Sequence, residues 1–159
     1  MSTLYVDTIT EKTSGNGVQI PGHVVQVVSA DGPNSEVIFT GSTFTDINLS
    51  ASITPKFATS KILVKFNFVS ATNNGSAGSY AIGLRILRDT TGIYENFRVP
   101  WGNSITGVGQ VAHLEYVDSP STTSAITYKV QAKNGAGSGN VTAHMGNSNA
   151  QVILMEIAQ

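Results

Sequence analysis

The chain has 159 residues, a formal net charge of -1 and no cysteine, and only 12% of its residues are charged. This composition offers no basic surface for nucleic acid, no disulfide and no thiolate ligand for a metal. Serine, threonine and asparagine together make up 46 residues; they disfavour helix interiors, and threonine suits strands. The length and composition therefore indicate one all-β domain with a short appendage.

The first 22 residues differ from the rest of the chain. Residues 4–9 and 17–22 are two short strand-like runs, joined by the flexible residues 13–17. Two short strands do not make a stable core by themselves. We therefore expect residues 1–22 to form an extended arm that docks on the body, on a neighbouring copy or on another protein. The arm lacks the basic start and apolar run of a signal peptide.

Residues 23–159 alternate between apolar and polar positions with a period of two. Glycine, asparagine and proline interrupt the alternation, for example at residues 31–34 and 134–137, and these residues reverse the chain at low cost. Such evenly spaced short segments predict a jelly-roll β-sandwich of about ten strands. The predicted strands are residues 24–29, 37–40, 45–53, 61–70, 80–88, 93–99, 111–117, 125–133, 140–145 and 151–157.

The last predicted strand, residues 151–157, is largely apolar on both faces, although it is too short to span a bilayer. In a strand with one solvent-exposed face, apolar and polar residues alternate more regularly. We therefore expect both faces of this strand to be covered. One would face the opposite sheet, and the other a neighbouring subunit or a loop of the same chain. We predict that a subunit interface includes Val152, Leu154 and Glu156, which share one face. The other face holds Ile153, Met155 and Ile157.

Two parts of the sequence resemble known proteins. Residues 4–23, LYVDTITEKTSGNGVQIPGH, resemble the N-terminal signature of tail-fibre-like virion proteins from phages of aquatic bacteria, cyanophages among them. Residues 52–64 (SITPKFATSKILV), 116–130 and 153–157 resemble the body domain of the same proteins. That domain is similar in plan to the trimeric jelly rolls of the tumour necrosis factor and complement globular-head type. The resemblance covers nearly the whole chain and brings no catalytic motif.

The resemblance implies a homotrimer with its last strand near the threefold axis. It also implies a virion protein, made in the host cytoplasm and joined to other virion proteins through residues 1–22. The resemblance does not settle the place on the particle, which could also be the baseplate. We predict a tail-fibre or knob-type module that contributes to host-surface attachment, and the alternative is a capsid decoration protein that stabilises the head. We expect no enzymatic activity, no cofactor, no metal, no nucleic-acid partner and no membrane insertion.

Polar loops supply the candidates for recognition of a host-surface glycan. Trp101, the single tryptophan, lies near Asn103 in a loop rich in glycine and asparagine, and Asn134 and Asn140 flank a second such loop. An aromatic ring beside amides can hold a sugar ring or a protein partner. More often, such a tryptophan packs against a neighbouring strand or subunit.

Other motifs favour ordinary structural roles. Residues 107–112, GVGQVA, fit a loose dinucleotide-binding pattern, but that pattern needs a following helix and the sequence here predicts a strand. His23, His113 and His144 lack metal-ligand spacing, and His113 is expected to hydrogen-bond Glu115 on the same strand face. The sequence has no Gly-x-Ser-x-Gly elbow. A polysaccharide hydrolase stays as an alternative because two carboxylates distant in sequence can meet in space.

Overall fold

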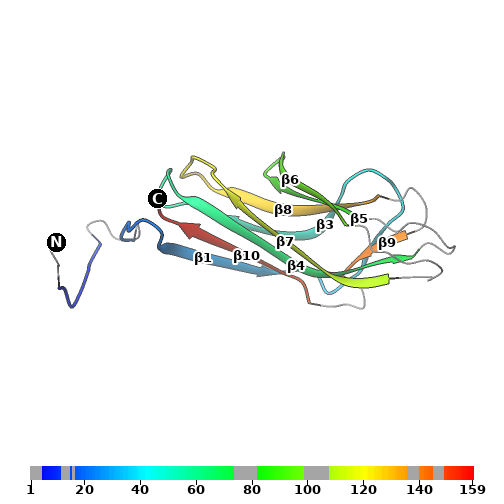
Figure 1. The fold of residues 1–159 in the computed structure, drawn as a ribbon, viewed down its shortest axis with the longest axis horizontal. Helices are drawn as coiled ribbons and strands as arrows, with labels where there is room; N and C mark the ends of the chain where they lie inside the picture. Colours follow the sequence, from blue (N-terminus) through cyan, green and yellow to red (C-terminus); the bar gives the residue numbers. More distant parts are fainter. Residues whose placement is uncertain are drawn as a thin grey trace.

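The computed structural model describes residues 5–11, 15, 17–73, 82–98, 108–135, 140–144 and 149–159. These residues form two β-sheets packed face to face (Figure 1). Each of the ten predicted strands is present, and two of them have the predicted bounds. The strands are β1 (Val24–Asp31), β2 (Val37–Phe39), β3 (Thr45–Ile53), β4 (Lys61–Asn73), β5 (Ile82–Arg88), β6 (Thr91–Arg98), β7 (Val108–Asp118), β8 (Ile126–Asn134), β9 (Asn140–Ala143) and β10 (Gln151–Ile157).

The strands are antiparallel and form a jelly-roll-like sandwich. The larger sheet has the order β1-β10-β4-β9-β2, and β7 pairs with β4 along its other edge. The smaller sheet has the order β3-β8-β5-β6. The first and last strands therefore lie side by side, as Figure 1 shows. No helix in the described part of the chain could cross a membrane.

The alternation along each strand decides which side chains meet between the sheets. In β8 every second residue is buried, and β10 alternates in the same way. These inward side chains form one hydrophobic core, in which each large side chain contributes about 1.5–3 kcal/mol by leaving water. The largest fully buried side chains are Tyr128, Phe66, Phe68, Ile47, Leu49, Ile53, Ile62, Ile82, Leu84, Ile86 and Leu154.

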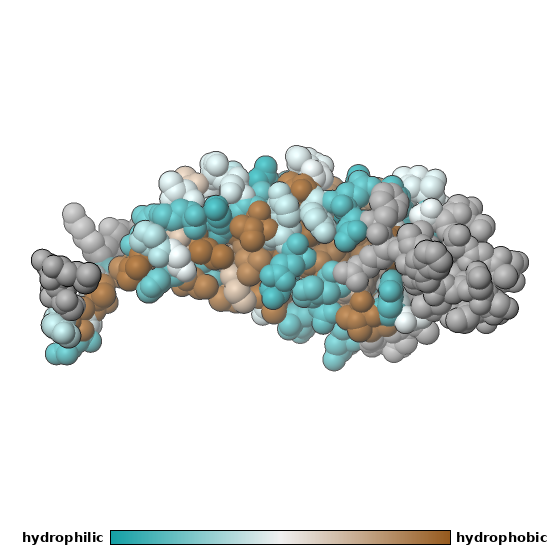
Figure 2. Space-filling view, in the orientation of Figure 1, coloured by the Kyte–Doolittle hydropathy of each residue, from teal (hydrophilic) through white to brown (hydrophobic). Residues whose placement is uncertain are grey.

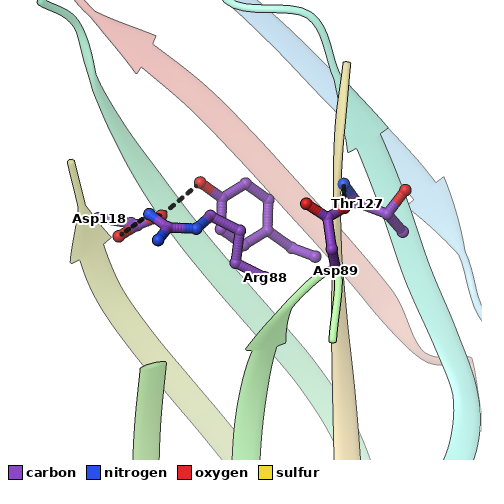
Figure 3. Close-up of polar contacts among 5 residues, drawn as sticks. Arg88, Asp89, Asp118 and Thr127 are labelled. Atoms are coloured by element: carbon purple, nitrogen blue, oxygen red, sulfur yellow. Dashed lines mark hydrogen bonds and ion pairs between the residues drawn. The ribbon is translucent and has the colours of Figure 1, made fainter. Parts of the chain in front are cut away.

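A buried carboxylate, Asp118, links the two sheets. It accepts hydrogen bonds from Arg88 Nη1, at 3.0 and 3.1 Å, and from the Tyr128 hydroxyl, at 2.8 Å (Figure 3). Asp118 ends β7 of the larger sheet, whereas its two partners belong to the smaller sheet. Burial and the hydrogen bond to Asp118 both raise the pKa of Tyr128, so its hydroxyl remains a donor.

The N-terminal arm projects from one end of the body (Figure 1). Its described residues, 5–11, 15 and 17–22, carry no strand, so the two strand-like runs predicted there do not form strands in these parts. Residues next to the body are nevertheless anchored to its C-terminal end. The amide of Gly22 donates to the Ala158 carbonyl (2.8 Å), and the amide of Ala158 donates to the His23 carbonyl (2.9 Å).

Candidate functional site

The prediction of a subunit interface on β10 chose the wrong face of the strand. Val152, Leu154 and Glu156 are fully buried inside their own chain, between the two sheets. A side chain that its own core already covers cannot meet a second copy. The residues between them point outward from the larger sheet and are only half-buried. An apolar contact through β10 must therefore use Ile153, Met155 or Ile157.

Of the four predicted recognition residues, Asn134 and Asn140 lie within the described part of the chain. Trp101 and Asn103 lie outside the described residues. Asn134 is only 2% exposed at the end of β8, and its backbone amide donates to the Gly41 carbonyl at 3.1 Å. Its assignment to a recognition loop is therefore wrong, because burial removes its side chain from any ligand. Asn140, at the start of β9, is exposed and pairs with Asn73 of β4.

The outer face of the larger sheet carries a row of apolar side chains. The strand register places Val27, Met155, Leu63 and Val117 opposite one another across β1, β10, β4 and β7. Val27 is 56% exposed and Val117 is 49% exposed. With Ile153 and Ile157 of β10, these residues form what we call the apolar belt: Val27, Leu63, Val117, Ile153, Met155 and Ile157.

The apolar belt occupies the half of this face nearer the arm. Figure 2 shows brown side chains over β1 and β10 on that side of the body, and a mixture of teal and brown side chains further from the arm. Further along the strands the outward positions are mixed: Ile153 lies opposite Lys65, and beyond them Val111 of β7 is again an exposed apolar residue. Lys65 and Glu115 form an ion pair there (3.7 Å), and His113 Nε2 lies 3.3 Å from the same carboxylate, as predicted for this pair.

The outer face of the smaller sheet is instead a network of charged and amide groups. Asp46, Gln131, Arg85 and Glu95 lie opposite one another across its four strands. Gln131 donates through Nε2 to Asp46 and accepts from Arg85 Nε at 2.7 Å. This hydrogen-bonded row is typical of a face in contact with water.

Charged side chains also cover the one aromatic ring described on this face. The guanidinium of Arg85 lies 4.3 Å from the centre of the Phe44 ring, and Lys133 Nζ lies 4.1 Å from it. Such cation–π contacts leave little apolar surface exposed. Among the described side chains, the two outer faces of the sandwich therefore differ, and the apolar belt lies on the larger sheet.

Glu156 anchors the loop between β3 and β4 to the last strand. Its carboxylate accepts hydrogen bonds from the amide of Lys56 (2.8 and 3.0 Å), the amide of Phe57 (3.1 Å) and Gln26 Nε2 (2.6 Å). Burial alone would raise the pKa of Glu156, but the hydrogen bonds from Gln26 and Lys56 outweigh it and lower that pKa. Glu156 is therefore an ionised structural group, a role that the sequence did not indicate.

The other residues considered for metal or nucleotide binding have structural roles in the described part of the chain. His144 is fully buried, with Nε2 2.6 Å from the Ile47 carbonyl. Within the described ranges, no three His, Asp or Glu side chains are grouped so that they could hold a metal ion. The glycine-containing stretch that resembled a nucleotide motif enters β7 (Val108–Asp118), so the predicted strand is confirmed and no helix follows it.

Comparisons with protein families and with curated proteins find no match to the sequence. Among solved structures, the fold is similar to the infectious bursal disease virus VP2 subviral particle, with 11% identity and a TM-score of 0.43, over 84% of this chain and 38% of that chain. The structure of the Gx strain of the same virus matches with 16% identity and a TM-score of 0.43, over 84% of this chain and 37% of that one.

A bacterial protein gives a similar result. Dimeric latent PorU from Porphyromonas gingivalis matches with 12% identity and a TM-score of 0.37, over 90% of this chain and 11% of that chain. This chain spans well under half the length of each of these three proteins. At such identities and TM-scores, the likeness carries no information on function.

Proposed function

We propose that this chain is a structural protein of a virus particle and works as a homotrimer whose copies pack through the apolar belt. The observation that carries self-association is the contrast between the two outer faces. The larger sheet exposes a contiguous row that includes Val27 and Val117, whereas the smaller sheet exposes hydrogen-bonded charges. Contiguous exposed apolar surface of this kind marks protein interfaces.

The number of copies and the kind of particle come from the sequence resemblance. Residues 4–23 and the body stretches resemble tail-fibre-like proteins of tailed phages, whose body is a trimeric jelly roll. The jelly-roll-like sandwich is the fold that this resemblance implies. The belt also lies partly on β10, the strand that the resemblance puts near the threefold axis.

The arm supports attachment to other virion proteins. Tyr5 is 90% exposed, Val6 51% and Ile9 59%, so the arm leaves apolar side chains uncovered. Hydrogen bonds between Gly22, His23 and Ala158 fix the point where the arm leaves the body. A segment that is anchored at one end and exposes apolar side chains is suited to docking on a larger assembly.

Within the particle, we favour a tail-fibre or knob module that contributes to host attachment. The exposed apolar arm supports a second candidate equally, a decoration protein that braces capsid subunits. We propose no enzymatic role, because the buried carboxylates Asp118 and Glu156 each accept several hydrogen bonds from their own chain. Neither carboxylate is free to transfer a proton to a glycosidic bond.

Two measurements test the proposal. Light scattering of the purified protein should give three times the chain mass of 16.7 kDa at micromolar concentration; a monodisperse monomer contradicts it. Purified protein added to host cells should bind them and slow phage adsorption if the chain is a knob. Particles that lack the protein, adsorb normally and rupture sooner on heating would instead identify a decoration protein. A cryo-EM map of the particle would locate the chain directly.

A further inference from the structure

A polar groove opens beside β1 and β10, beyond the apolar belt. It has a volume of about 400 Å³, and its polar lining is Asp31, Asn34, Asn67, Asn149 and Gln151. This volume falls within the roughly 300–1,000 Å³ that is usual for small-molecule sites. No lysine or arginine lines the groove. In this respect the groove differs from the rest of this face, where Lys65 pairs with Glu115.

The floor of the groove is held in place by a close backbone approach. The amide of Gly32 donates to the Ala150 carbonyl at 2.8 Å. A Cβ atom at Gly32 would lie 2.7 Å from the Cβ of Ala150 and 3.0 Å from Cδ1 of Leu49. Only glycine therefore lets the loop after β1 approach residue 150 this closely. The two segments that line the groove are thus fixed relative to each other.

The polar side chains converge because of the strand register. Asp31 lies opposite Gln151, and Gln151 lies opposite Asn67, so the three are neighbours across strands about 4.8 Å apart. Gln151 Nε2 donates weakly to Asp31 Oδ1, at 3.4 Å. In the described chain, the side chains of Asn34, Asn67 and Asn149 make no hydrogen bond. Three carboxamides with free donors and acceptors therefore surround one groove.

We infer that this groove binds a neutral saccharide unit. A carboxamide offers donors and an acceptor side by side, which match neighbouring hydroxyl groups of a sugar ring, and the Asp31 carboxylate adds an acceptor for further hydroxyls. An acidic sugar would meet the negative charge of Asp31 and find no cation in the lining. A single carboxylate likewise makes a poor calcium site.

The inference deepens the proposed function, since it assigns the host-attachment role to a defined surface and rests on that role for its biological meaning. The groove is open and lined by polar groups, so each copy binds weakly. Three copies on one particle component would raise the overall avidity without further contacts. Because no charge pairing is involved, we expect binding to change little with salt.

The test is saturation-transfer difference NMR of the full chain with defined probes. The neutral probes are L-rhamnose, D-galactose and N-acetylglucosamine with their disaccharides, and the acidic ones are glucuronic acid and N-acetylneuraminic acid. At least one neutral probe should give a signal, and the acidic ones should give weaker signals or none. The double variant Asn67→Ala/Asn149→Ala should bind at least about fivefold more weakly, because it removes two sets of hydrogen bonds.

Gln131→Ala is the matched control, since it removes a carboxamide from the outer face of the smaller sheet, outside the groove. It should bind as the wild type does. The inference is overturned if no neutral probe binds, if an acidic probe binds more strongly, or if Gln131→Ala loses as much binding as the double variant. Light scattering and particle incorporation of the double variant report separately on the proposed function. A trimer that enters particles but binds no neutral saccharide contradicts only this inference.

Discussion

Met155 of β10 lies directly opposite Leu63 of β4, and both side chains point away from the core on the outer face of the larger sheet. The same row continues to Val27 on β1 and Val117 on β7. The neighbouring β10 residues, Leu154 and Glu156, belong entirely to the core. Two substitutions one residue apart should therefore have different effects, one on association and the other on folding.

Met155→Glu should dissociate the trimer and leave the chain folded. A charge placed in an apolar interface without a partner costs about 3 kcal/mol or more per subunit. Size-exclusion chromatography with light scattering should show a monomer, while the circular dichroism spectrum stays that of a β-protein. Ser50→Glu, at an exposed position of β3 opposite Lys129, is the control and should remain a trimer. Met155→Glu that is still trimeric would exclude the apolar belt as the interface.

Leu154→Arg should unfold the protein rather than only dissociate it. Leu154 is fully buried between the sheets, so a charged side chain there loses both packing and hydration. We expect the free energy of unfolding to fall by about 4 kcal/mol or more, which exceeds most single substitutions. Urea denaturation followed by circular dichroism measures it. A folded monomer with unchanged stability would contradict the burial of this residue.

Glu156→Gln should reduce the sensitivity of the protein to acid. The pKa of Glu156 is lower in the folded state than its usual value of about 4.3. Its stabilising effect is therefore fully present above that value and is lost as pH falls through the folded-state pKa. Urea midpoints measured from pH 6 to pH 3 should fall steeply for the wild type and less steeply for Glu156→Gln. Glu95→Gln, at an exposed ion pair, should follow the wild type.

Tyr128→Phe should weaken the link between the two sheets. It removes the 2.8 Å hydrogen bond to Asp118 but keeps the buried ring. Hydrogen bonds to charged groups contribute about 1.5–3 kcal/mol, and we expect a loss of stability in that range. Lys129→Ala, which removes an exposed ion pair with Asp46, should cost about 1 kcal/mol or less. Equal losses in thermal denaturation of the two variants would show that the Asp118 link has no special role.

Deletion of residues 2–16 should leave a folded trimer that no longer enters particles. The deletion keeps Gly22 and His23, whose backbone hydrogen bonds to Ala158 tie the arm to the body. The lost residues include Tyr5, Val6 and Ile9, whose exposed apolar side chains supply the proposed docking contact. Incorporation is measured by complementing a phage that lacks the gene and probing purified particles. Failure of the truncated chain to fold would make the arm part of the domain instead.

The sequence by itself determined the strands and the fold class. Alternation with a period of two, interrupted by glycine, asparagine and proline, predicted all ten strands of the sandwich. It also showed that residues 151–157 have two apolar faces. These features are local, because they depend on side chains two residues apart and on backbone preferences within a turn.

Only the tertiary structure decided which of those faces points inward. The choice depends on the strands beside β10 and on the sheet opposite it, which come from distant parts of the sequence. Val152, Leu154 and Glu156 point into the core because β10 lies between β1 and β4 with that register. A shift of one residue would exchange the two faces. The apolar belt, the hydrogen bonds of Glu156 and the polar groove all result from this register.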